Sequence, residues 1–172
     1  MELLNENHKY EYGCVMLYFD FPDMKSLHKK IDVNDIHNPD GSFGLETEPH
    51  TTLLFGLHPE VTDDHIKEVL SKHRFGSCQI RNASLFENTE YDVLKFDVSG
   101  EGLHECNSDL TKYPHTTSFP IYHPHMTIGY LKSGTGKKHT ELFKNMMFSL
   151  TPQYAVYSKP DGTKTKFKIN LK

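Results

Sequence analysis

PHTTL at residues 49–53 and PHMTI at residues 124–128 share one pattern: proline, histidine, any residue, threonine and an aliphatic residue. Each motif opens an apolar run, HTTLLFGL at 50–57 and HMTIGYL at 125–131, whose composition is typical of buried strands. One such motif in a chain with 12 histidines would have little diagnostic value. Two copies with the same neighbours indicate that the two strands occupy corresponding places in a duplicated domain.

The elements around the two motifs follow the same order. In the first half we predict strands at 13–21, 50–57 and 78–86, helices at 23–31 and 62–73, and a long loop at 32–48. In the second half we predict strands at 91–98 and 125–131, helices at 101–112 and 137–146, and a final hairpin of strands 148–157 and 164–171 around a turn at 160–162. The sequence therefore predicts one α+β domain, residues 1–172, with pseudo-symmetric halves of about 13–88 and 89–172.

Composition sets the broad class of the protein. The 172 residues are 36% hydrophobic and 24% charged, which suits a globular domain, and the net charge of −4 does not favour long nucleic acid as a partner. No secretory signal or membrane span is visible, and the three cysteines are scattered, so we expect a cytoplasmic protein without disulfides. We also expect a monomer that has no membrane partner.

The residue types of the two motifs suit phosphodiester cleavage. Alternate residues of a strand face the same side, so His50 shares a face with Thr52, and His125 with Thr127. A pseudo-two-fold axis would bring both pairs to one cleft. Histidine can act as base or acid near neutral pH, and threonine hydroxyls can donate to the phosphate oxygens, so this chemistry requires no metal or cofactor. The sequence does not distinguish which histidine is the acid.

These residues resemble a known family. The paired His-x-Thr-hydrophobic motifs and the order of elements resemble the two-histidine (2H) phosphoesterases of LigT-like fold. Residues 12–21, 49–57, 83–88 and 123–130 resemble in particular the phage anti-CBASS nucleases. The resemblance implies a two-lobed fold with antiparallel-rich sheets around a central cleft and helices outside. It also implies metal-independent hydrolysis of 3′–5′ linked cyclic di- and trinucleotides, such as cyclic GMP-AMP, in the cytoplasm of an infected bacterium.

The resemblance also assigns residues. His50, Thr52, His125 and Thr127 match its catalytic positions. Family members close aromatic residues over the nucleobases, which implies a substrate-binding role for Tyr12 and Tyr10, although core packing explains a tyrosine beside a strand equally well. The chain has no tryptophan to take such a role.

Other readings of the sequence remain open. A 2H enzyme could act instead on RNA ends or 2′,3′-cyclic phosphates, and a catalytically silent module could sequester a cyclic nucleotide. His123 and His125 have a spacing that can bind zinc, but the matching position in the first repeat is Glu48, so we expect no metal site. The run 132–138 resembles a phosphate-binding loop without its full spacing, and we interpret it as a basic turn before a helix.

Overall fold

The computed structural model describes residues 10–172. The helices are α1 (Met24–Lys29), α2 (Asp63–Ser71), α3 (Leu103–Leu110) and α4 (Gly136–Phe143), with a short 3₁₀ helix at Val33–Asp35. The strands are β1 (Gly13–Phe19), β2 (His50–Leu57), β3 (Arg74–Phe75), β4 (Cys78–Glu87), β5 (Tyr91–Ser99), β6 (His125–Lys132), β7 (Met147–Leu150), β8 (Pro152–Ser158), β9 (Lys164–Phe167) and β10 (Asn170–Leu171). Every helix predicted from the sequence is found, with ends shifted by one to three residues.

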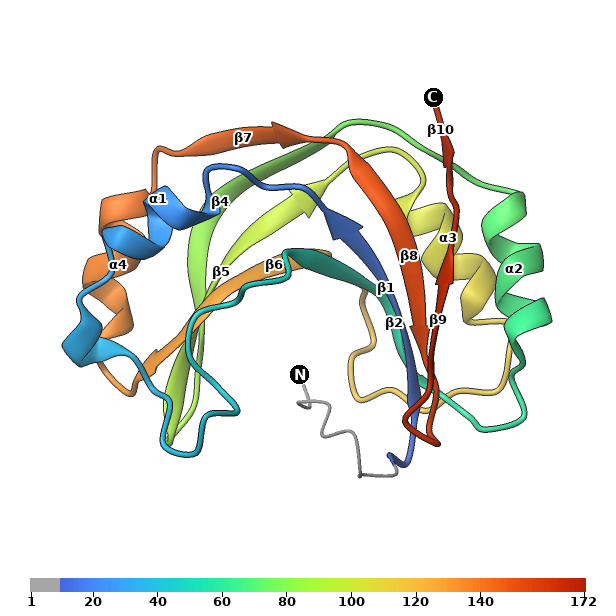
Figure 1. Cartoon of the computed structure of the whole chain (residues 1–172), viewed down its shortest axis with the longest axis horizontal. Helices are drawn as coiled ribbons and strands as arrows, with labels where there is room; N and C mark the ends of the chain where they lie inside the picture. The colour runs from blue at the N-terminus through green and yellow to red at the C-terminus, as the bar shows by residue number, and fades with distance from the viewer. Residues whose placement is uncertain (1–9) are drawn as a thin grey trace.

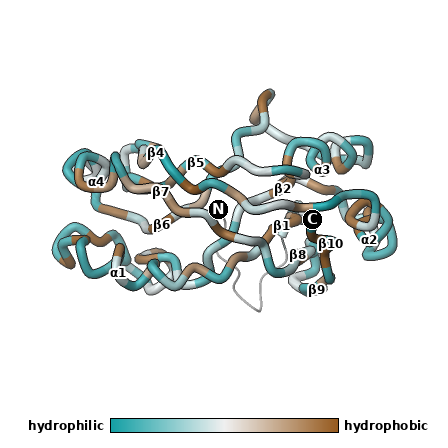
Figure 2. The backbone as a smooth tube through the Cα atoms, turned by 90° about the horizontal axis from the view of Figure 1, so that it is seen from above, coloured by the Kyte–Doolittle hydropathy of each residue, from teal (hydrophilic) through white to brown (hydrophobic). Residues whose placement is uncertain are grey.

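Two four-stranded antiparallel sheets form an arch (Figure 1). Sheet A has the strand order β2-β1-β8-β9 and sheet B the order β6-β5-β4-β7, so the equivalent strands of the two repeats occupy equivalent places. Helices α1 and α4 lie at the outer end of sheet B, and α2 and α3 at the outer end of sheet A (Figures 1 and 2). The α+β architecture predicted from the sequence is confirmed.

The C-terminal strands differ from the sequence prediction. The strand expected at 148–157 is divided at Thr151: β7 pairs with β4 in sheet B, and β8 pairs with β1 in sheet A. Pro152 explains the division, because it has no backbone N–H to donate to a continuous ladder. The strand expected at 164–171 is also divided, since only β9 pairs with β8, whereas β10 runs parallel to β3. Each sheet therefore contains strands from both halves of the chain.

The two repeats exchange their first helices. Helix α1 follows β1 of sheet A, yet His28 hydrogen-bonds the carbonyl of Ile128 in sheet B, 3.2 Å away. Helix α3 follows β5 of sheet B, yet it packs on β2, and Asn107 Nδ2 donates to the carbonyl of Leu53 at 2.6 Å. These crossed contacts tie the two sheets into one body.

Two loops hydrogen-bond to β2 and β6 along the edge of each strand that no described strand of its own sheet pairs with. The loop at 32–48 runs alongside β6. The amide of Tyr130 donates to the carbonyl of Gly44, and the amide of Glu46 donates to the carbonyl of Ile128. The segment that comes after α3 in the chain runs alongside β2 in the same way, since the amide of Thr116 donates to the carbonyl of Gly56. An added Cβ on Gly56 would lie 1.9 Å from the carbonyl oxygen of Thr116, so this approach requires glycine.

One continuous apolar core fills the space between the sheets and the helices. Leu17 of β1, Leu53 of β2, Phe96 of β5 and Ile128 of β6 are fully buried in it. No helix in residues 10–172 is long and apolar enough to cross a membrane.

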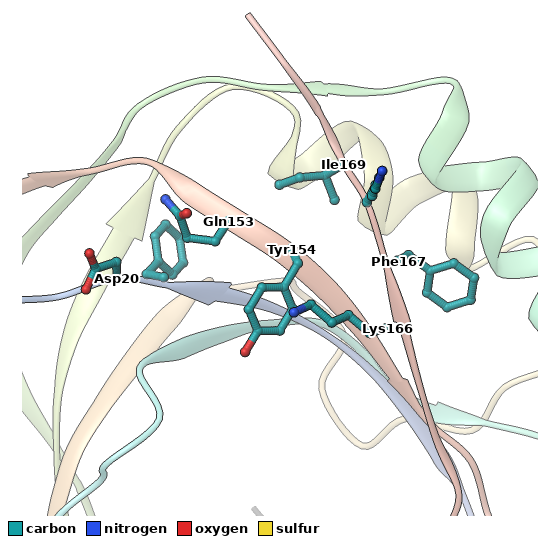
Figure 3. A pocket seen from close by; sticks show the side chains of 8 residues that line it. Asp20, Gln153, Tyr154, Lys166, Phe167 and Ile169 are labelled. Atoms are coloured by element: carbon teal, nitrogen blue, oxygen red, sulfur yellow. The ribbon is translucent and has the colours of Figure 1, made fainter.

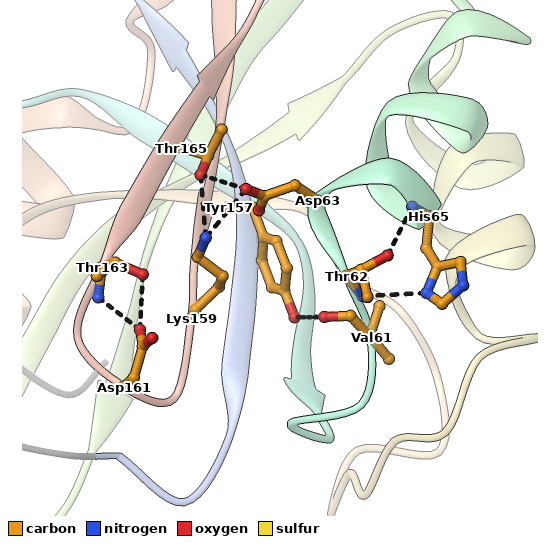
Figure 4. Close-up of polar contacts among 9 residues, drawn as sticks. All are labelled: Val61, Thr62, Asp63, His65, Tyr157, Lys159, Asp161, Thr163 and Thr165. Atoms are coloured by element: carbon orange, nitrogen blue, oxygen red, sulfur yellow. Dashed lines mark hydrogen bonds and ion pairs between the residues drawn. The ribbon is translucent and has the colours of Figure 1, made fainter.

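The predicted terminal hairpin forms at the end of sheet A (Figure 4). Lys159 Nζ donates to Asp63 Oδ2 at 3.0 Å, and Thr165 Oγ1 donates to the same oxygen at 2.9 Å. The hydroxyl of Tyr157 donates to the carbonyl of Val61 at 2.8 Å. These bonds join the hairpin to the N-terminus of α2, which Thr62 caps by accepting a hydrogen bond from the amide of His65.

Candidate active site

The two motif strands meet in the middle of the arch. β2 and β6 are the inner edge strands of sheets A and B and contact each other there (Figure 1). Leu53 and Ile128, which alternate with the motif residues, are fully buried in the core beneath the helices. The motif histidines and threonines therefore lie on the opposite face of each sheet, the inner face of the arch.

The strand register sets the neighbours of each motif residue. In sheet A, His50 lies opposite Tyr18 and Thr52 opposite Met16. In sheet B, His125 lies opposite Asp97 and Thr127 opposite Lys95. Directly opposed residues of antiparallel strands share a face, so each sheet presents two rows of side chains to the same cleft.

Both motif histidines are oriented in the same way. His50 Nδ1 lies 2.8 Å from the carbonyl of Glu48, and His125 Nδ1 lies 3.1 Å from the carbonyl of His123. A carbonyl oxygen can only accept, so Nδ1 carries the hydrogen in both rings. The lone pair of each neutral imidazole is then on Nε2, the nitrogen that can take or give a proton in catalysis.

The surroundings of the two histidines differ. The ring of His50 lies 5.2 Å from that of Tyr18, whereas the ring of His125 meets the edge of Phe86 at 5.1 Å. Burial lowers the pKa of His125, and the charges of Lys95 and His50 act in the same direction. His125 therefore favours its neutral form at neutral pH, the form that a general base needs.

The motif threonines are held firmly. Thr127 is 7% exposed, and its neighbour across the strands is Lys95. The hydroxyl of Tyr122, from the loop that follows α3, donates to the carbonyl of Thr52 at 2.8 Å. A hydroxyl on a fixed strand needs only a side-chain rotation to donate to a phosphate oxygen as negative charge develops there.

An aromatic row extends the histidine row across sheet A. Tyr18 stacks on Tyr154 of β8 with ring centroids 5.3 Å apart, and Lys166 Nζ lies 4.0 Å from the centroid of Tyr154. The sequence reasoning missed this row. The signal was present in the run 13–21, where Tyr18 falls on the opposite face from Leu17 and Phe19.

An open groove of about 830 Å³ adjoins this row (Figure 3). Its lining comes from the end of β1, the start of β8, and β9 with the residues after it: Phe19, Asp20, Gln153, Tyr154, Lys166, Phe167, Lys168 and Ile169. Lys166 extends toward the ring of Tyr154 (Figure 3). The groove combines aromatic surface with positive charge beside the row that contains His50.

Two sequence-predicted binding residues lie away from the histidines. Tyr12 stacks on His58 at 5.8 Å and touches the edge of Phe55, at the end of β2 remote from His50. Tyr12 precedes β1 and lies six positions before Tyr18, the residue opposite His50, which corresponds to about 20 Å of extended chain. The amide of Tyr10 donates to the carbonyl of Pro160 at 2.7 Å. Contact of either tyrosine with a substrate stays a prediction.

The glycine-rich turn at 132–138 has a structural partner. The amides of Gly134 and Gly136 both donate to Asp92 Oδ2, each at 3.0 Å. The carboxylate of Asp92, 3% exposed, occupies the position at which an anion would sit. The run is thus a turn before α4, as the sequence interpretation has it.

The described part of the chain contains three cysteines and no cluster of potential metal ligands. Burial raises the pKa of Cys14 and of Cys106 to about 12 and that of Cys78 to about 11, so all three remain thiols at neutral pH. Within residues 10–172, no three histidine, cysteine, aspartate or glutamate side chains are grouped as metal ligands would be.

Comparisons with known proteins identify the fold. No protein-family model matches the chain, and no characterised protein matches it by sequence. The structure of Usb1 from Kluyveromyces marxianus aligns with a TM-score of 0.60 and 10% identity over 93% of this chain and 99% of the other. The structure of the same Usb1 with uridine monophosphate aligns with a TM-score of 0.59 and 10% identity over 92% of this chain and 98% of the other. A structure described as a phosphoesterase aligns with a TM-score of 0.49 and 13% identity over 91% of this chain and 95% of the other. The chain has the LigT-like fold predicted from the sequence.

Proposed function

We propose that this protein is a phosphodiesterase whose general acid and base are His50 and His125. The observation that carries the proposal is the meeting of two His-x-Thr pairs on one face, from the edge strands of two equivalent sheets. Each ring is fixed by the same Nδ1 bond to a carbonyl two residues earlier. Paired imidazoles aligned in this way can remove one proton and supply another across a single phosphate.

The reaction on a 3′–5′ linkage follows from these roles. One histidine removes the proton of the ribose 2′-hydroxyl, whose oxygen then attacks the phosphorus. The other histidine protonates the 5′-oxygen as its bond to phosphorus breaks. The product is a linear molecule that ends in a 2′,3′-cyclic phosphate, and water can open this ring in a second step with the roles of the histidines reversed. Thr52 and Thr127 donate to the non-bridging oxygens throughout.

His125 is the proposed base. Its pKa is lowered by desolvation and by the nearby charge of Lys95, which favours the neutral ring that can accept a proton. His50 then acts as the acid. The strand register provides this distinction, because the residues opposite the two histidines, Tyr18 and Asp97, differ although the motifs match.

The proposed substrates are 3′–5′ linked cyclic di- and trinucleotides, so that the protein would counter CBASS immunity in an infected bacterium. The resemblance to phage anti-CBASS nucleases supports this choice. The row of Tyr18 and Tyr154 offers aromatic faces for bases, and Lys166 and Lys168 line a groove that could accept a further phosphate. A cyclic molecule carries at least two phosphates, so it can use both regions together.

A linear RNA end is the second candidate substrate. The observation that favours it is the shared fold with Usb1, which has been seen with uridine monophosphate. An enzyme of this kind would open a terminal 2′,3′-cyclic phosphate and leave cyclic dinucleotides intact.

The deciding experiment is a turnover assay with a chelator present. Purified protein is incubated with a panel of 3′–5′ cyclic di- and trinucleotides and with a short RNA that ends in a 2′,3′-cyclic phosphate, and the products are identified by mass spectrometry. We expect many turnovers to linear products. Opening of the terminal ring alone supports the second candidate, whereas stoichiometric binding without products indicates a sequestering module and contradicts catalysis.

Two variants link turnover to the site. His50→Ala and His125→Ala should each reduce the rate at least about a hundred-fold, within the usual contribution of a general acid or base. His104→Ala, which removes an exposed histidine of α3, is the matched control and should retain full activity. Equal activity of all three variants would refute the assigned roles.

A further inference from the structure

Lys95 faces the same cleft as the motif residues. It lies on β5 between Ser84 of β4 and Thr127 of β6, and the strand register pairs it with both. Paired residues of neighbouring antiparallel strands have Cβ atoms about 5 Å apart on one face. A row of Ser84, Lys95 and Thr127 therefore crosses sheet B next to the row that contains His125.

The ammonium group of Lys95 is buried with few partners. Its side chain is 10% exposed, and its Nζ donates one hydrogen bond, to Ser84 Oγ at 2.7 Å. Asp97 Oδ1 lies 3.8 Å away, beyond hydrogen-bonding distance, and the ring centroid of Phe86 lies 4.4 Å away. An ammonium has three N–H donors, and among the described residues only Ser84 accepts one of them.

A cation in this position is unfavourable for folding. Burial disfavours the charge of Lys95 and lowers its pKa, and the carboxylate of Asp97 opposes this effect. A buried charge usually has several partners, because unpaired burial costs free energy. Two donors without an acceptor in the described chain therefore point to a ligand.

The other repeat shows that the fold does not require a lysine here. Met16 of β1 is the equivalent residue, since it lies opposite Thr52 as Lys95 lies opposite Thr127. Met16 is 4% exposed and packs with Tyr18 and Val156. The same backbone position can thus hold an apolar side chain, so a local function must account for the charge of Lys95.

We propose that Lys95 Nζ binds a non-bridging oxygen of the phosphate held between the two His-x-Thr pairs. This inference rests on the proposed function. Negative charge on these oxygens grows as the diester is cleaved, and a cation fixed in a cleft with little water stabilises it more than a flexible surface lysine could. Lys95 and the hydroxyl of Thr127 would bind the phosphate together from sheet B.

The test measures ligand binding and so does not depend on turnover. Binding of uridine monophosphate and of uridine is measured by calorimetry at neutral pH for the wild type and Lys95→Met, which keeps an unbranched side chain next to Phe86. We expect the variant to bind the monophosphate about ten-fold more weakly or worse, in line with the loss of one charged hydrogen bond. Binding of uridine, which has no phosphate, should be unchanged.

Lys159→Met is the matched control. Lys159 is also partly buried and bonded to an aspartate and a hydroxyl, but it lies on the terminal hairpin at the α2 end of sheet A (Figure 4). It should bind both ligands as the wild type does. If Lys95→Met does not fold, Lys95→Gln replaces it, because glutamine can keep a hydrogen bond to Ser84.

The outcomes separate the two proposals. Unchanged monophosphate binding by a folded Lys95 variant overturns the role of Lys95, even where the wild type cleaves its substrate. Weakened monophosphate binding supports it, even where no diester in the panel is cleaved. The wild type is also tested with inorganic phosphate and a cyclic dinucleotide, and failure to bind any of these phosphates overturns the inference.

Discussion

Asp92 offers a quantitative test of the structural interpretation of the glycine-rich turn. Its Oδ2 accepts hydrogen bonds from the amides of Gly134 and Gly136, both at 3.0 Å. In Asp92→Ala the amide of Gly136 stays buried without an acceptor, which costs about 2–3 kcal/mol, because the lost bond is to a charged group. The amide of Gly134 is on an exposed residue that water can reach, which adds about 1 kcal/mol. The expected loss of stability is therefore about 3–4 kcal/mol.

Urea unfolding followed by circular dichroism measures this loss. Asp92→Asn keeps an acceptor oxygen and loses only the charge, so it should cost about 1–2 kcal/mol. Asp161→Ala is the control, because its exposed carboxylate also accepts two hydrogen bonds, both from Thr163, and water can replace them. Turnover per folded molecule should be unchanged in every variant. A cost below about 1 kcal/mol for Asp92→Ala, or a specific loss of phosphate binding, would refute the interpretation of this run as a structural turn.

Two further predictions concern the histidine roles and the loop contacts. Lys95→Met removes a charge that lowers the pKa of His125, so this pKa should rise. If His125 is the base, the acid limb of the pH–rate profile should move to higher pH. Movement of the alkaline limb instead would make His125 the acid. Gly56→Ala should destabilise the fold by about 2–4 kcal/mol, because it adds a clash with Thr116 to a φ of +110°. Gly41→Ala, with a φ of +83° and open space around it, should cost about 1 kcal/mol. Equal losses of stability for both variants would contradict the close contact between Gly56 of β2 and Thr116 of the segment after α3.

Local sequence patterns were enough to place the motif strands. The run 50–57 is β-branched and apolar and follows a proline, and β2 has these bounds. Its alternation already places His50 and Thr52 on the face away from the core. The match between residues 49–53 and 124–128 then predicts an equivalent arrangement in the second repeat, and the sheet orders have this equivalence.

The pairing between distant segments could not be read from these patterns. Nothing local to the strand predicted at 148–157 says that its two parts join different sheets, although Pro152 signals an interruption. The exchange of α1 and α3 between the sheets depends on tertiary packing, because each helix has an apolar face that could cover either sheet. Periodicity says which face is buried and leaves the partner undetermined.

Lys95 was missed for a related reason. In the run 91–99 it is one polar residue in an alternating pattern, which is equally typical of a solvated strand face. Only the register reveals that its neighbours are Thr127 and Ser84 and that it is buried. A charged residue on a strand face thus has no assigned role until the opposite strands are known.

The differences between the repeats are as informative as their match. A duplicated pair of motifs supplies two equivalent imidazoles, but cleavage needs one to be a base and the other an acid. The residue opposite His50 is Tyr18, whereas the residue opposite His125 is Asp97. The residue opposite the motif threonine is Met16 in sheet A and Lys95 in sheet B. Under the proposed mechanism both sheets bind the phosphate through their threonines, sheet B adds the charge of Lys95 and keeps its histidine neutral, and sheet A offers aromatic faces to the bases. The symmetric residues would then perform the proton transfers, and the asymmetric ones would decide the direction of the reaction and the substrate.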